Sequence, residues 1–420
     1  MNRIVYNILW LAALPLLPLR LWWRGRHEPG YRERMGERFG RYAIARPPGE
    51  VLWVHAVSVG ETRAALPLIE KVLAQRPALH IVLTHMTATG RATGHALLKD
   101  RVTQAWLPYD VPFAVRRFLD WSRPKLGVLI ETELWPNLVH ECERAGIPVL
   151  LANARLSERS VRGYRRTGSL ARDMLRSLTG VAAQSAEDAQ RLVSLGARDV
   201  FVTGNFKFDV TPSASALEAA RELRERFGRS RPVLTLASTR EGEEPLLFDA
   251  LARNAGNLPS DLLIVVVPRH PQRFDEVADL LRTRGLRFVR RTAMDTAGAD
   301  VRVVLGDSMG EMFAYYGASD VAFVAGSLLP HGGQNLLEPI ALGVPVLVGP
   351  HTFNFAEAAR AAVHAGAAIR VGDADELFER AATLLADPQK RATMSRCANA
   401  FIAEHRGATQ HVWEWLELRV

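Results

Sequence analysis

Cysteine is scarce in this chain of 420 residues, which contains Cys142 and Cys397 alone. The two lie far apart and match no metal-ligand spacing, and such sparse usage suits a reducing compartment. The sequence also lacks short repeats and low-complexity tracts, which excludes a repeat architecture. Acidic residues are outnumbered by basic ones, 45 against 53, and the net charge of +8 favours anionic partners such as nucleotides, phospholipids or nucleic acids.

The overall composition is that of a globular protein. Hydrophobic residues make up 48% of the chain and charged residues 23%, which excludes a disordered protein. A chain of this length is too long for one core of ordinary size, so we expect two domains.

The N-terminal segment is the longest apolar stretch. Residues 4–23 are apolar with two exceptions, which is about the length that spans a bilayer as a helix, although Pro15 and Pro18 interrupt it. A pair of tryptophans followed by arginines is typical of a membrane end with its basic side in the cytoplasm. A cleavable signal peptide is the competing interpretation, but no convincing cleavage site follows. We expect residues 1–48 to form an uncleaved anchor with a basic juxtamembrane segment, or else a peripheral helix.

Residues 49–210 alternate apolar runs with helical periodicity. This alternation predicts a parallel sheet that is covered by helices on both faces. The predicted strands are 51–57, 80–87, 102–108, 125–131, 147–153, 181–185 and 200–204.

A linker-like stretch at 211–215 precedes a second series of the same kind, so residues 211–420 are predicted to form a second domain. Two doubly wound α/β domains in series predict a cleft between the carboxyl ends of both sheets. The predicted strands are 233–238, 262–268, 301–306, 321–326, 344–349 and 367–371, followed by a mostly helical tail over 374–418.

A glycine-rich stretch, residues 332–343, separates two apolar runs of the second domain. A turn of this kind between a strand and a short helix presents free backbone N–H groups that attract phosphate. Glu338 lies inside the helix and could accept hydrogen bonds from ribose hydroxyls. The alternative is an ordinary strand–turn–helix in which Glu338 is a surface charge, because glycine-rich turns are common.

Acidic side chains follow two strands of the first domain. Glu61 opens the helix after the first predicted strand, and Glu131 and Glu133 follow the fourth. Ligands of open α/β sheets bind at such strand ends, and paired carboxylates suit general-base catalysis and the support of positive charge. The alternative for Glu61 is a first-turn glutamate that complements the helix dipole. The alternative for Glu131 and Glu133 is a helix cap.

Basic side chains lie at comparable positions. Lys207 ends the first domain and could neutralise a phosphate or a carboxylate, or it could be a solvated lysine. Arg269 follows a strand of the second domain, where a guanidinium pairs well with phosphate. Residues 306–311 form a strand–turn–helix start that could offer N–H donors, or in which Ser308 or Asp307 caps the helix.

Seven arginines fall between Arg155 and Arg176, against Glu158 and Asp173. They form either a solvated helix face or, with an anchor upstream, a surface for an anionic lipid.

Five of these motifs, taken in order, resemble the Kdo transferases of Gram-negative lipopolysaccharide synthesis. They are residues 55–61, 131–137, 204–209, 268–271 and 332–339, so the resemblance covers nearly the whole chain. It implies a GT-B fold, in which two Rossmann-like doubly wound domains face a central cleft, behind an N-terminal membrane-anchor helix.

The family moves 3-deoxy-D-manno-octulosonic acid (Kdo) from CMP-Kdo to a lipid A precursor at the cytoplasmic face of the inner membrane. By this resemblance Glu61 matches the family's general base, and Glu131 and Lys207 match its transition-state stabilisers. Its CMP-contacting segments match Pro268, Arg269, Met309, Gly310, Glu311, Asn335, Leu336, Leu337 and Glu338.

The implied partners are CMP-Kdo, an anionic lipid A precursor and the inner membrane, with no nucleic acid. The scheme requires no cofactor and no metal. Asp373 and Asp375 have the spacing of a sugar-nucleotide metal motif, but we interpret them as part of a helix cap.

Two other classes of function fit parts of the sequence. A GT-B-like sugar-nucleotide epimerase would need no membrane anchor, so the apolar N-terminus and the arginine run argue against it. A non-catalytic, membrane-bound nucleic-acid binder is suggested by the positive charge alone, and the carboxylates at strand ends argue against it.

Overall fold

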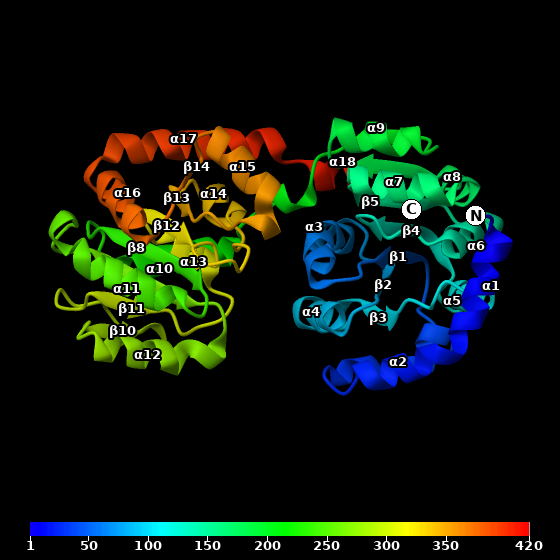
Figure 1. Cartoon of the computed structure of the whole chain (residues 1–420), viewed down its shortest axis with the longest axis horizontal. Helices are drawn as coiled ribbons and strands as arrows, with labels where there is room; N and C mark the ends of the chain where they lie inside the picture. Colours follow the sequence, from blue (N-terminus) through cyan, green and yellow to red (C-terminus); the bar gives the residue numbers. More distant parts are fainter. Residues whose placement is uncertain (420) are drawn as a thin grey trace. The chain divides into compact units, whose positions relative to one another are not determined.

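The computed structural model describes residues 1–419, which form two compact α/β units (Figure 1). The first unit comprises Met1–Asp209 together with the C-terminal segment that begins at His405. The second comprises Val210–Glu404.

The first unit is built on a seven-stranded, wholly parallel sheet in the order β3-β2-β1-β4-β5-β6-β7. The strand order reverses between β1 and β4, and the carboxyl ends of the strands at such a point form the usual ligand crevice of the fold. The strands are β1 (Val51–His55), β2 (His80–His85), β3 (Thr103–Trp106), β4 (Pro124–Ile130), β5 (Val149–Ala154), β6 (Gly180–Ala183) and β7 (Val200–Val202).

Helices cover both faces of this sheet because alternate strand residues are apolar on both sides. Side chains such as Leu52 and Val54 pack with α3, α4 and α18, whereas Trp53 and Val82 pack with α5, α6, α8 and α9. The helices are α1 (Arg3–Ala13), α2 (Leu17–Arg24), α3 (Val59–Gln75), α4 (Ala88–Leu98), α5 (Pro112–Ser122), α6 (Pro136–Arg144), α7 (Glu158–Thr167), α8 (Ser169–Arg176), α9 (Ala186–Ser194) and α18 (Ala408–Glu417), with short 3-10 turns η1 (Leu14–Leu16), η2 (Pro29–Arg32), η3 (Met35–Phe39), η4 (Lys99–Arg101) and η5 (Phe206–Phe208).

The second unit holds another seven-stranded parallel sheet, in the order β10-β11-β9-β8-β12-β13-β14. Its first strand, β8, pairs with both β9 and β12, which gives this unit a switch point of the same kind. The strands are β8 (Val233–Thr239), β9 (Leu263–Pro268), β10 (Phe288–Arg290), β11 (Val303–Leu305), β12 (Val321–Val324), β13 (Val346–Val348) and β14 (Ala368–Arg370).

Helices again lie on both faces. One core cluster joins the sheet to α11, α12 and α16, and another joins it to α10 and α13. The helices are α10 (Ala214–Phe227), α11 (Glu243–Arg253), α12 (Phe274–Thr283), α13 (Met312–Gly317), α14 (Leu337–Ala341), α15 (Ala356–His364), α16 (Ala374–Ala386) and α17 (Pro388–His405), with 3-10 turns η6 (Ala255–Asn257), η7 (Pro271–Arg273), η8 (Arg291–Ala293) and η9 (Phe353–Phe355).

Every strand predicted from the apolar runs is present, so the predicted fold class is confirmed. The strand that the sequence did not reveal is β10, at the edge of the second sheet. It is three residues long and one of them is Arg290, so no apolar run marks it in the sequence. All three residues are partly exposed. An edge strand needs to bury only part of its surface.

The C-terminus differs from the predicted domain 211–420. Helix α18 belongs to the first unit, where Val412, Trp413 and Leu416 are buried in the same core cluster as α3. Asp209 fixes the start of this segment, because its carboxylate oxygens accept hydrogen bonds from the backbone N–H groups of Gly407 (2.6 Å) and Thr409 (2.5 Å). The helical periodicity of the tail is continuous, so the sequence did not show that the chain goes back to the first unit after α17.

The N-terminal segment 1–48 is also part of the first unit and is not a separate body. The stretch Arg3–Arg24 is long and apolar enough to cross a membrane, as predicted, with the turn η1 at Pro15 between α1 and α2. Its juxtamembrane arginines are not all directed to solvent. Arg38 is 2% exposed and its guanidinium lies 3.9 Å from the ring centre of Trp106.

Candidate functional site

In the first unit, the turn from β1 into α3 fixes the side chain of Glu61. Ser58 is the N-cap of α3, and its Oγ accepts from the N–H of Glu61 (3.4 Å) and donates to Glu61 Oε1 (2.9 Å). The N–H of Val57 donates to Glu61 Oε2 (2.6 Å). These contacts form a variant of the capping box, in which Glu61 accepts from the residue before the N-cap, so Glu61 does help to cap α3. The same contacts hold the carboxylate at the carboxyl end of β1.

The segment after β4 holds two more carboxylates outside regular structure. Glu131 has a left-handed backbone (φ +63°), which is uncommon for a residue with a side chain and turns the chain sharply as the strand ends. Glu133 Oε2 accepts a hydrogen bond from Trp135 Nε1 (3.2 Å), and α6 begins at the next residue, Pro136. Glu131 and Glu133 therefore lie at the strand that neighbours β1.

The three carboxylates influence one another electrostatically. Burial and, to a smaller extent, the negative charges of Glu133 and Glu131 raise the pKa of Glu61 to about 7, against the hydrogen bonds from Val57 and Ser58 that lower it. Burial and the charge of Glu131 also raise the pKa of Glu133. The structure thus brings together Glu61, Glu131 and Glu133 at the switch point of the sheet. A carboxylate with a pKa near the working pH is well suited to act as a general base.

The substitution Glu133→Gln tests this coupling. Removing one negative charge makes ionisation of Glu61 easier, so the pKa of Glu61 falls and the acidic limb of the pH–rate profile moves to lower pH. Profiles of kcat/KM for wild type and variant measure the shift. A limb that stays at the same pH in a variant that is folded and active would show that Glu133 does not act on the titrating group.

Lys207, the third predicted catalytic residue, lies in η5 on a backbone that side-chain amides hold in place. Asn205 Oδ1 accepts from the N–H of Lys207 (3.0 Å), and Asn153 Oδ1 accepts from the N–H of Phe206 (3.0 Å). Gln184 links the two asparagines, because its Nε2 donates to the carbonyl of Asn153 (2.9 Å) and its Oε1 accepts from Asn205 Nδ2 (2.9 Å). Phe206 is buried in the core cluster that includes α3, so η5 packs beside the helix that Glu61 opens.

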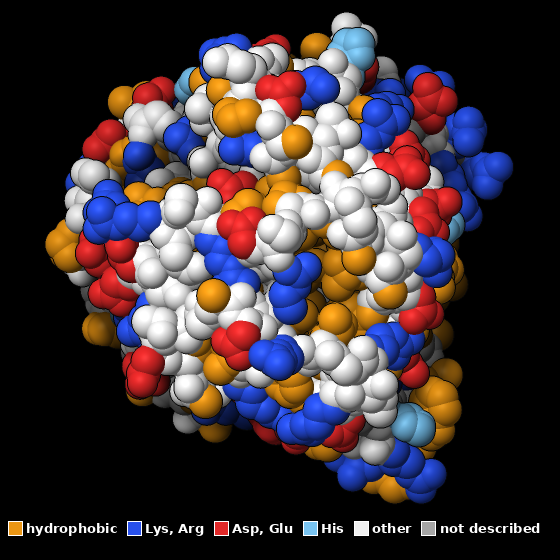
Figure 2. Space-filling view, turned by 90° about the vertical axis from the view of Figure 1, so that its left-hand side faces the viewer, with side chains coloured by type: hydrophobic (Ala, Val, Ile, Leu, Met, Phe, Trp, Pro, Cys, Tyr) orange, Lys and Arg blue, Asp and Glu red, His pale blue; other side chains and the backbone are white. Residues whose placement is uncertain are grey.

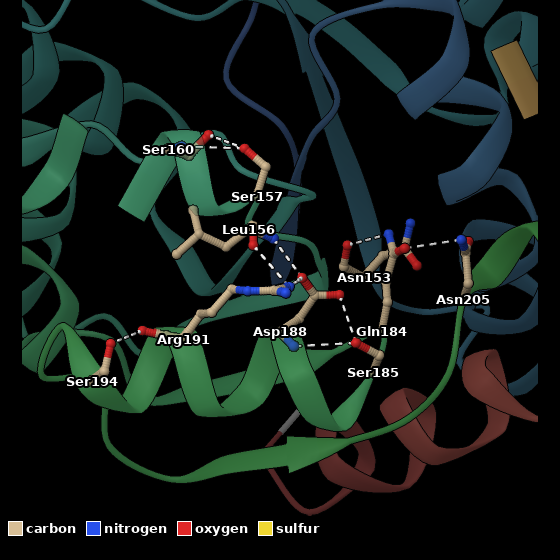
Figure 3. A network of polar contacts seen from close by, with 10 residues as sticks. All are labelled: Asn153, Leu156, Ser157, Ser160, Gln184, Ser185, Asp188, Arg191, Ser194 and Asn205. Carbon is tan, nitrogen blue, oxygen red and sulfur yellow. Dashed lines mark hydrogen bonds and ion pairs between the residues drawn. The ribbon is translucent and has the colours of Figure 1, made fainter. Parts of the chain in front are cut away.

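Sequence reasoning missed Asn153 and Gln184. Asn153 is wholly buried and has a left-handed backbone (φ +54°), a conformation that asparagine adopts more readily than most residues. The sequence does show an asparagine at the end of an apolar run, but Asn153 was counted only as the last residue of the predicted strand 147–153. The same network continues through Asp188, which accepts from the N–H of Leu156 (2.8 Å) and from Ser185 Oγ (3.0 Å) and so fixes the loop after β5 (Figure 3).

In the second unit, two predicted nucleotide-binding residues lie close to the same buried side chain, Tyr316. Burial raises the pKa of Tyr316, the charge of Glu338 raises it further, and the charge of Arg269 lowers it. Arg269 follows β9, and its N–H donates to the carbonyl of Thr239 at the end of β8 (3.0 Å). Glu338 lies in α14, where its Oε1 accepts from Asn335 Nδ2 (3.1 Å). Arg269, which follows β9, and Glu338 in α14 therefore both act on Tyr316.

The predicted glycine-rich turn between β12 and α14 is present. Gly332 and Gly333 have left-handed backbones (φ +94° and +75°), and a Cβ on Gly332 would lie 2.4 Å from Asn354 Nδ2, so this turn requires glycine. The start of the loop is anchored by Glu243, which sequence reasoning missed. Its wholly buried carboxylate accepts from the N–H groups of Gly326 (2.7 Å), Leu328 (3.0 Å) and Arg240 (3.0 Å).

The third predicted segment, residues 309–311, lies between β11 and α13. Glu311 is the N-cap residue of α13, so the alternative in which Ser308 or Asp307 caps this helix is wrong. Asp307 instead accepts from the N–H (3.0 Å) and the hydroxyl (2.8 Å) of Thr292, which draws its carboxylate away from the helix start. Glu311 pairs with Arg291 (3.2 Å).

Asp373 and Asp375 serve the helix α16. Asp373 is its N-cap and accepts from the N–H of Glu376 (2.9 Å), as predicted, and Asp375 forms an ion pair with Arg253 (2.6 Å). Across residues 1–419, no three His, Cys, Asp or Glu side chains are grouped so that they could hold a metal ion.

The two-unit architecture places the chain in a structural class. It resembles the UDP-GlcNAc 2-epimerase of Neisseria meningitidis bound to UDP-GlcNAc (TM-score 0.57, 17% identity, 88% of this chain and 99% of that chain). It also resembles HepE of Anabaena in complex with UDP (TM-score 0.55, 18% identity, 88% and 100%). At these identities the likeness concerns the fold alone, which is the GT-B fold.

Sequence similarity then identifies the family. Residues 33–210 match the family described as 3-deoxy-D-manno-octulosonic-acid transferase (kdotransferase), and residues 290–400 match glycosyl transferases group 1. The chain is 45% identical to a 3-deoxy-D-manno-octulosonic acid transferase of Bordetella pertussis over 99% of both chains. It is 38% identical to that of Haemophilus influenzae over 99% of this chain and 98% of the other. The protein therefore belongs to the 3-deoxy-D-manno-octulosonic acid transferase family and is a glycosyltransferase.

This assignment argues against both alternative functions. The epimerases are related to the chain by fold at 17% identity, whereas the transferases are related over the whole sequence at 38% and 45%. An enzyme of this family is not a non-catalytic nucleic-acid binder.

Proposed function

We propose that the protein is an inverting glycosyltransferase that moves Kdo from CMP-Kdo to a lipid A precursor of the lipid IVA type in lipopolysaccharide core biosynthesis. The observation that carries this proposal is the carboxylate of Glu61, half-buried at the switch point, with a pKa raised to about 7 and two further carboxylates beside it. Family membership supplies the chemistry that such a group would serve.

The acceptor of this reaction is a sugar hydroxyl, which is a weak nucleophile. Glu61 takes the hydroxyl proton as the oxygen attacks the anomeric carbon of Kdo, and the bond from that carbon to the CMP phosphate breaks. Positive charge develops on the sugar during this step, and Glu131 stabilises it. A single displacement of this kind inverts the anomeric configuration.

The departing CMP gathers negative charge, which the guanidinium of Arg269 neutralises. Lys207, a residue of the first unit, is assigned as a stabiliser of the transition state. The nucleotide is assigned to the second unit, in contact with Pro268 and Arg269, with residues 309–311, and with residues 335–338. Glu338 accepts hydrogen bonds from the ribose hydroxyls in this scheme. The convergence of Arg269 and Glu338 near Tyr316 supports it.

The variant Glu338→Gln tests the donor site. Exchange of the charged acceptor for an amide weakens CMP binding by about 1–3 kcal/mol, because hydrogen bonds to charged groups are the stronger ones. Calorimetry with CMP on folded protein measures the change. Glu357→Gln, an exposed glutamate in the first turn of α15, is the matched control and leaves the affinity unchanged. Equal affinities in wild type and Glu338→Gln would end this assignment.

Transfer is proposed to be independent of metal ions, because the guanidinium of Arg269 supplies positive charge for the leaving phosphate. We expect activity to survive treatment with EDTA. Complete loss of activity on chelation, restored by magnesium or manganese, would contradict this proposal.

The enzyme is proposed to work at the cytoplasmic face of the inner membrane, held there by its N-terminal helix. The apolar stretch Arg3–Arg24 and the arginines that follow it support this location.

The test of the function is incubation of purified, detergent-solubilised protein with CMP-Kdo and a lipid A precursor, followed by mass analysis of the acceptor. We expect the acceptor to gain the mass of Kdo and CMP to be released. An unchanged acceptor, with CMP-Kdo intact, would overturn the proposal.

A further inference from the structure

The N-terminal helix is bound to the first unit along its length by polar contacts. The hydroxyl of Tyr6 donates to Asp110 Oδ2 (2.9 Å), and Asn7 Oδ1 accepts from Asn137 Nδ2 (2.7 Å). Further along, Leu17 and Leu21 are buried against the unit, at 7% and 3% exposed. One side of this apolar segment therefore faces protein from α1 to α2.

The partners of Tyr6 and Asn7 belong to a buried polar cluster. Asp110 is 2% exposed and also accepts from the N–H groups of Asn137 (2.9 Å) and Leu138 (2.8 Å), which begin α6. A helix that stood away from the unit would leave Asp110 and Asn137 with fewer partners. It would also carry the polar groups of Tyr6 and Asn7 into hydrocarbon, and each unsatisfied group there costs several kcal/mol.

The opposite side of the same segment is apolar and exposed. Ile4, Leu16, Leu19 and Trp23 are each at least 60% exposed, and Ile8 and Leu9 are 58% and 57% exposed. The stretch Arg3–Arg24 therefore has a face that contacts the folded unit and an exposed outer face that is apolar up to Arg20. A helix of this kind fits the interface of a bilayer, with the outer face in the acyl region.

Arginines lie at both ends of this outer face. At one end, the amino group of Met1 donates to the carbonyl of Thr167 (3.1 Å), which places the start of α1 beside the junction of α7 and α8. Arg165 and Arg166 precede that junction and are exposed, as are Arg20 and Arg24 at the other end. The end of α7, which carries Arg165 and Arg166, thus lies beside the start of α1, and the charge of these arginines complements anionic lipid headgroups.

The surface of the second unit differs. Several of its arginines are paired with acidic residues, as in Arg253–Asp375, Arg284–Asp249 and Arg290–Asp275. Figure 2 shows basic and acidic side chains interspersed over the face that it views. The net positive charge is therefore not gathered on that face.

We propose that the N-terminal helix does not span the bilayer but lies flat in the cytoplasmic leaflet, with its outer face in the acyl region and the flanking arginines on anionic phospholipid headgroups. This rests on the proposed location at the membrane and specifies how the membrane is bound. The segment of 22 residues is about 33 Å long as a helix and so is long enough to span. The contacts of Tyr6 and Asn7 with the folded unit oppose that orientation.

Cysteine labelling tests the topology in the full chain. Arg3→Cys and, as control, Arg159→Cys on α7 are placed in a Cys397→Ser background, because the other thiol, Cys142, is buried. A membrane-impermeant maleimide is applied to inverted inner-membrane vesicles and to spheroplasts. A flat helix gives labelling of both sites in inverted vesicles and of neither in spheroplasts. Labelling of Arg3→Cys in spheroplasts, with protection in inverted vesicles, would show a spanning helix and overturn the proposal.

Vesicle binding tests the charged ends. Arg165→Ala combined with Arg166→Ala should weaken partitioning onto phosphatidylglycerol vesicles about tenfold to thirtyfold, and binding to phosphatidylcholine vesicles should hardly change. The matched control is Arg221→Ala with Arg229→Ala, two exposed arginines of the second unit. Equal losses in both double variants, or no loss in either, would contradict the assigned surface. Kdo transfer in detergent is measured on the same proteins, so a failure of the proposed function is seen separately from a failure of the topology.

Discussion

Replacement of Glu61 by glutamine should slow Kdo transfer by about two to four orders of magnitude, the usual effect of losing a general base. Glutamine keeps the length of the side chain and is the other residue that completes a capping box, so the start of α3 remains intact. An amide cannot take up the hydroxyl proton, so the loss falls on kcat. Steady-state transfer rates measure the effect.

Two comparisons make this result specific. Glu70→Gln changes an exposed glutamate of the same helix, which pairs with Arg101 at 2.6 Å, and should leave transfer unchanged. Calorimetry of Glu61→Gln with CMP should give the wild-type affinity, because the nucleotide is assigned to the second unit. If Glu61→Gln works at nearly the wild-type rate while Glu131→Gln or Glu133→Gln is inactive, the base lies after β4.

Replacement of Lys207 by methionine should reduce kcat by about two to three orders of magnitude, the range found when one preorganised charge-stabilising group is removed. Methionine has a similar length without the charge. The backbone at this position is held by Asn205 and Asn153 and not by the lysine side chain, so η5 should persist. Lys207→Arg should recover part of the rate, because it restores the charge with a different shape.

The matched control for this prediction is Lys125→Met. Lys125 is exposed in β4, close to the amino end of that strand, where it pairs with Glu50 (2.9 Å). Its removal should leave kcat unchanged. A folded Lys207→Met variant that retains full kcat would remove Lys207 from the proposed mechanism.

The fold and the first carboxylates were predictable from the sequence for a simple reason. Buried parallel strands are continuous apolar runs, and their carboxyl ends lie at one edge of the sheet. Glu61 opens the helix after the first of these runs and Glu131 ends the fourth, and these strands, β1 and β4, prove to be neighbours. The turn around Gly332 was predictable because it joins two further runs.

The supporting residues were not predictable, because their partners come from distant parts of the chain. Asn153 holds residues of η5, and Glu243 holds a loop more than eighty residues later in the sequence. No local pattern marks an asparagine or a glutamate for such a role. Helix α18 was assigned to the wrong domain for the same reason, since its contacts with α3 cross nearly the whole chain.

The N-terminal helix shows a different limit of sequence reasoning. Its hydropathy and length are those of a spanning helix, and both properties are confirmed. What the pattern cannot show is that Tyr6 and Asn7 meet Asp110 and Asn137 of the folded unit. Because of these two contacts, we infer a helix with one side on the folded unit and the other side in lipid.

The most direct test of the account is the pH dependence of kcat/KM for Kdo transfer, measured side by side for wild type and Glu61→Gln. Because burial and neighbouring carboxylates raise the pKa of Glu61 to about 7, the base is protonated and inactive below that pH and ionised above it. The account predicts that the wild-type rate rises through about pH 7 to a plateau, and that Glu61→Gln is slow at every pH and lacks this rise. The same rise in Glu61→Gln, or a wild-type rate that is flat across this range, would contradict the assignment of Glu61 as the general base.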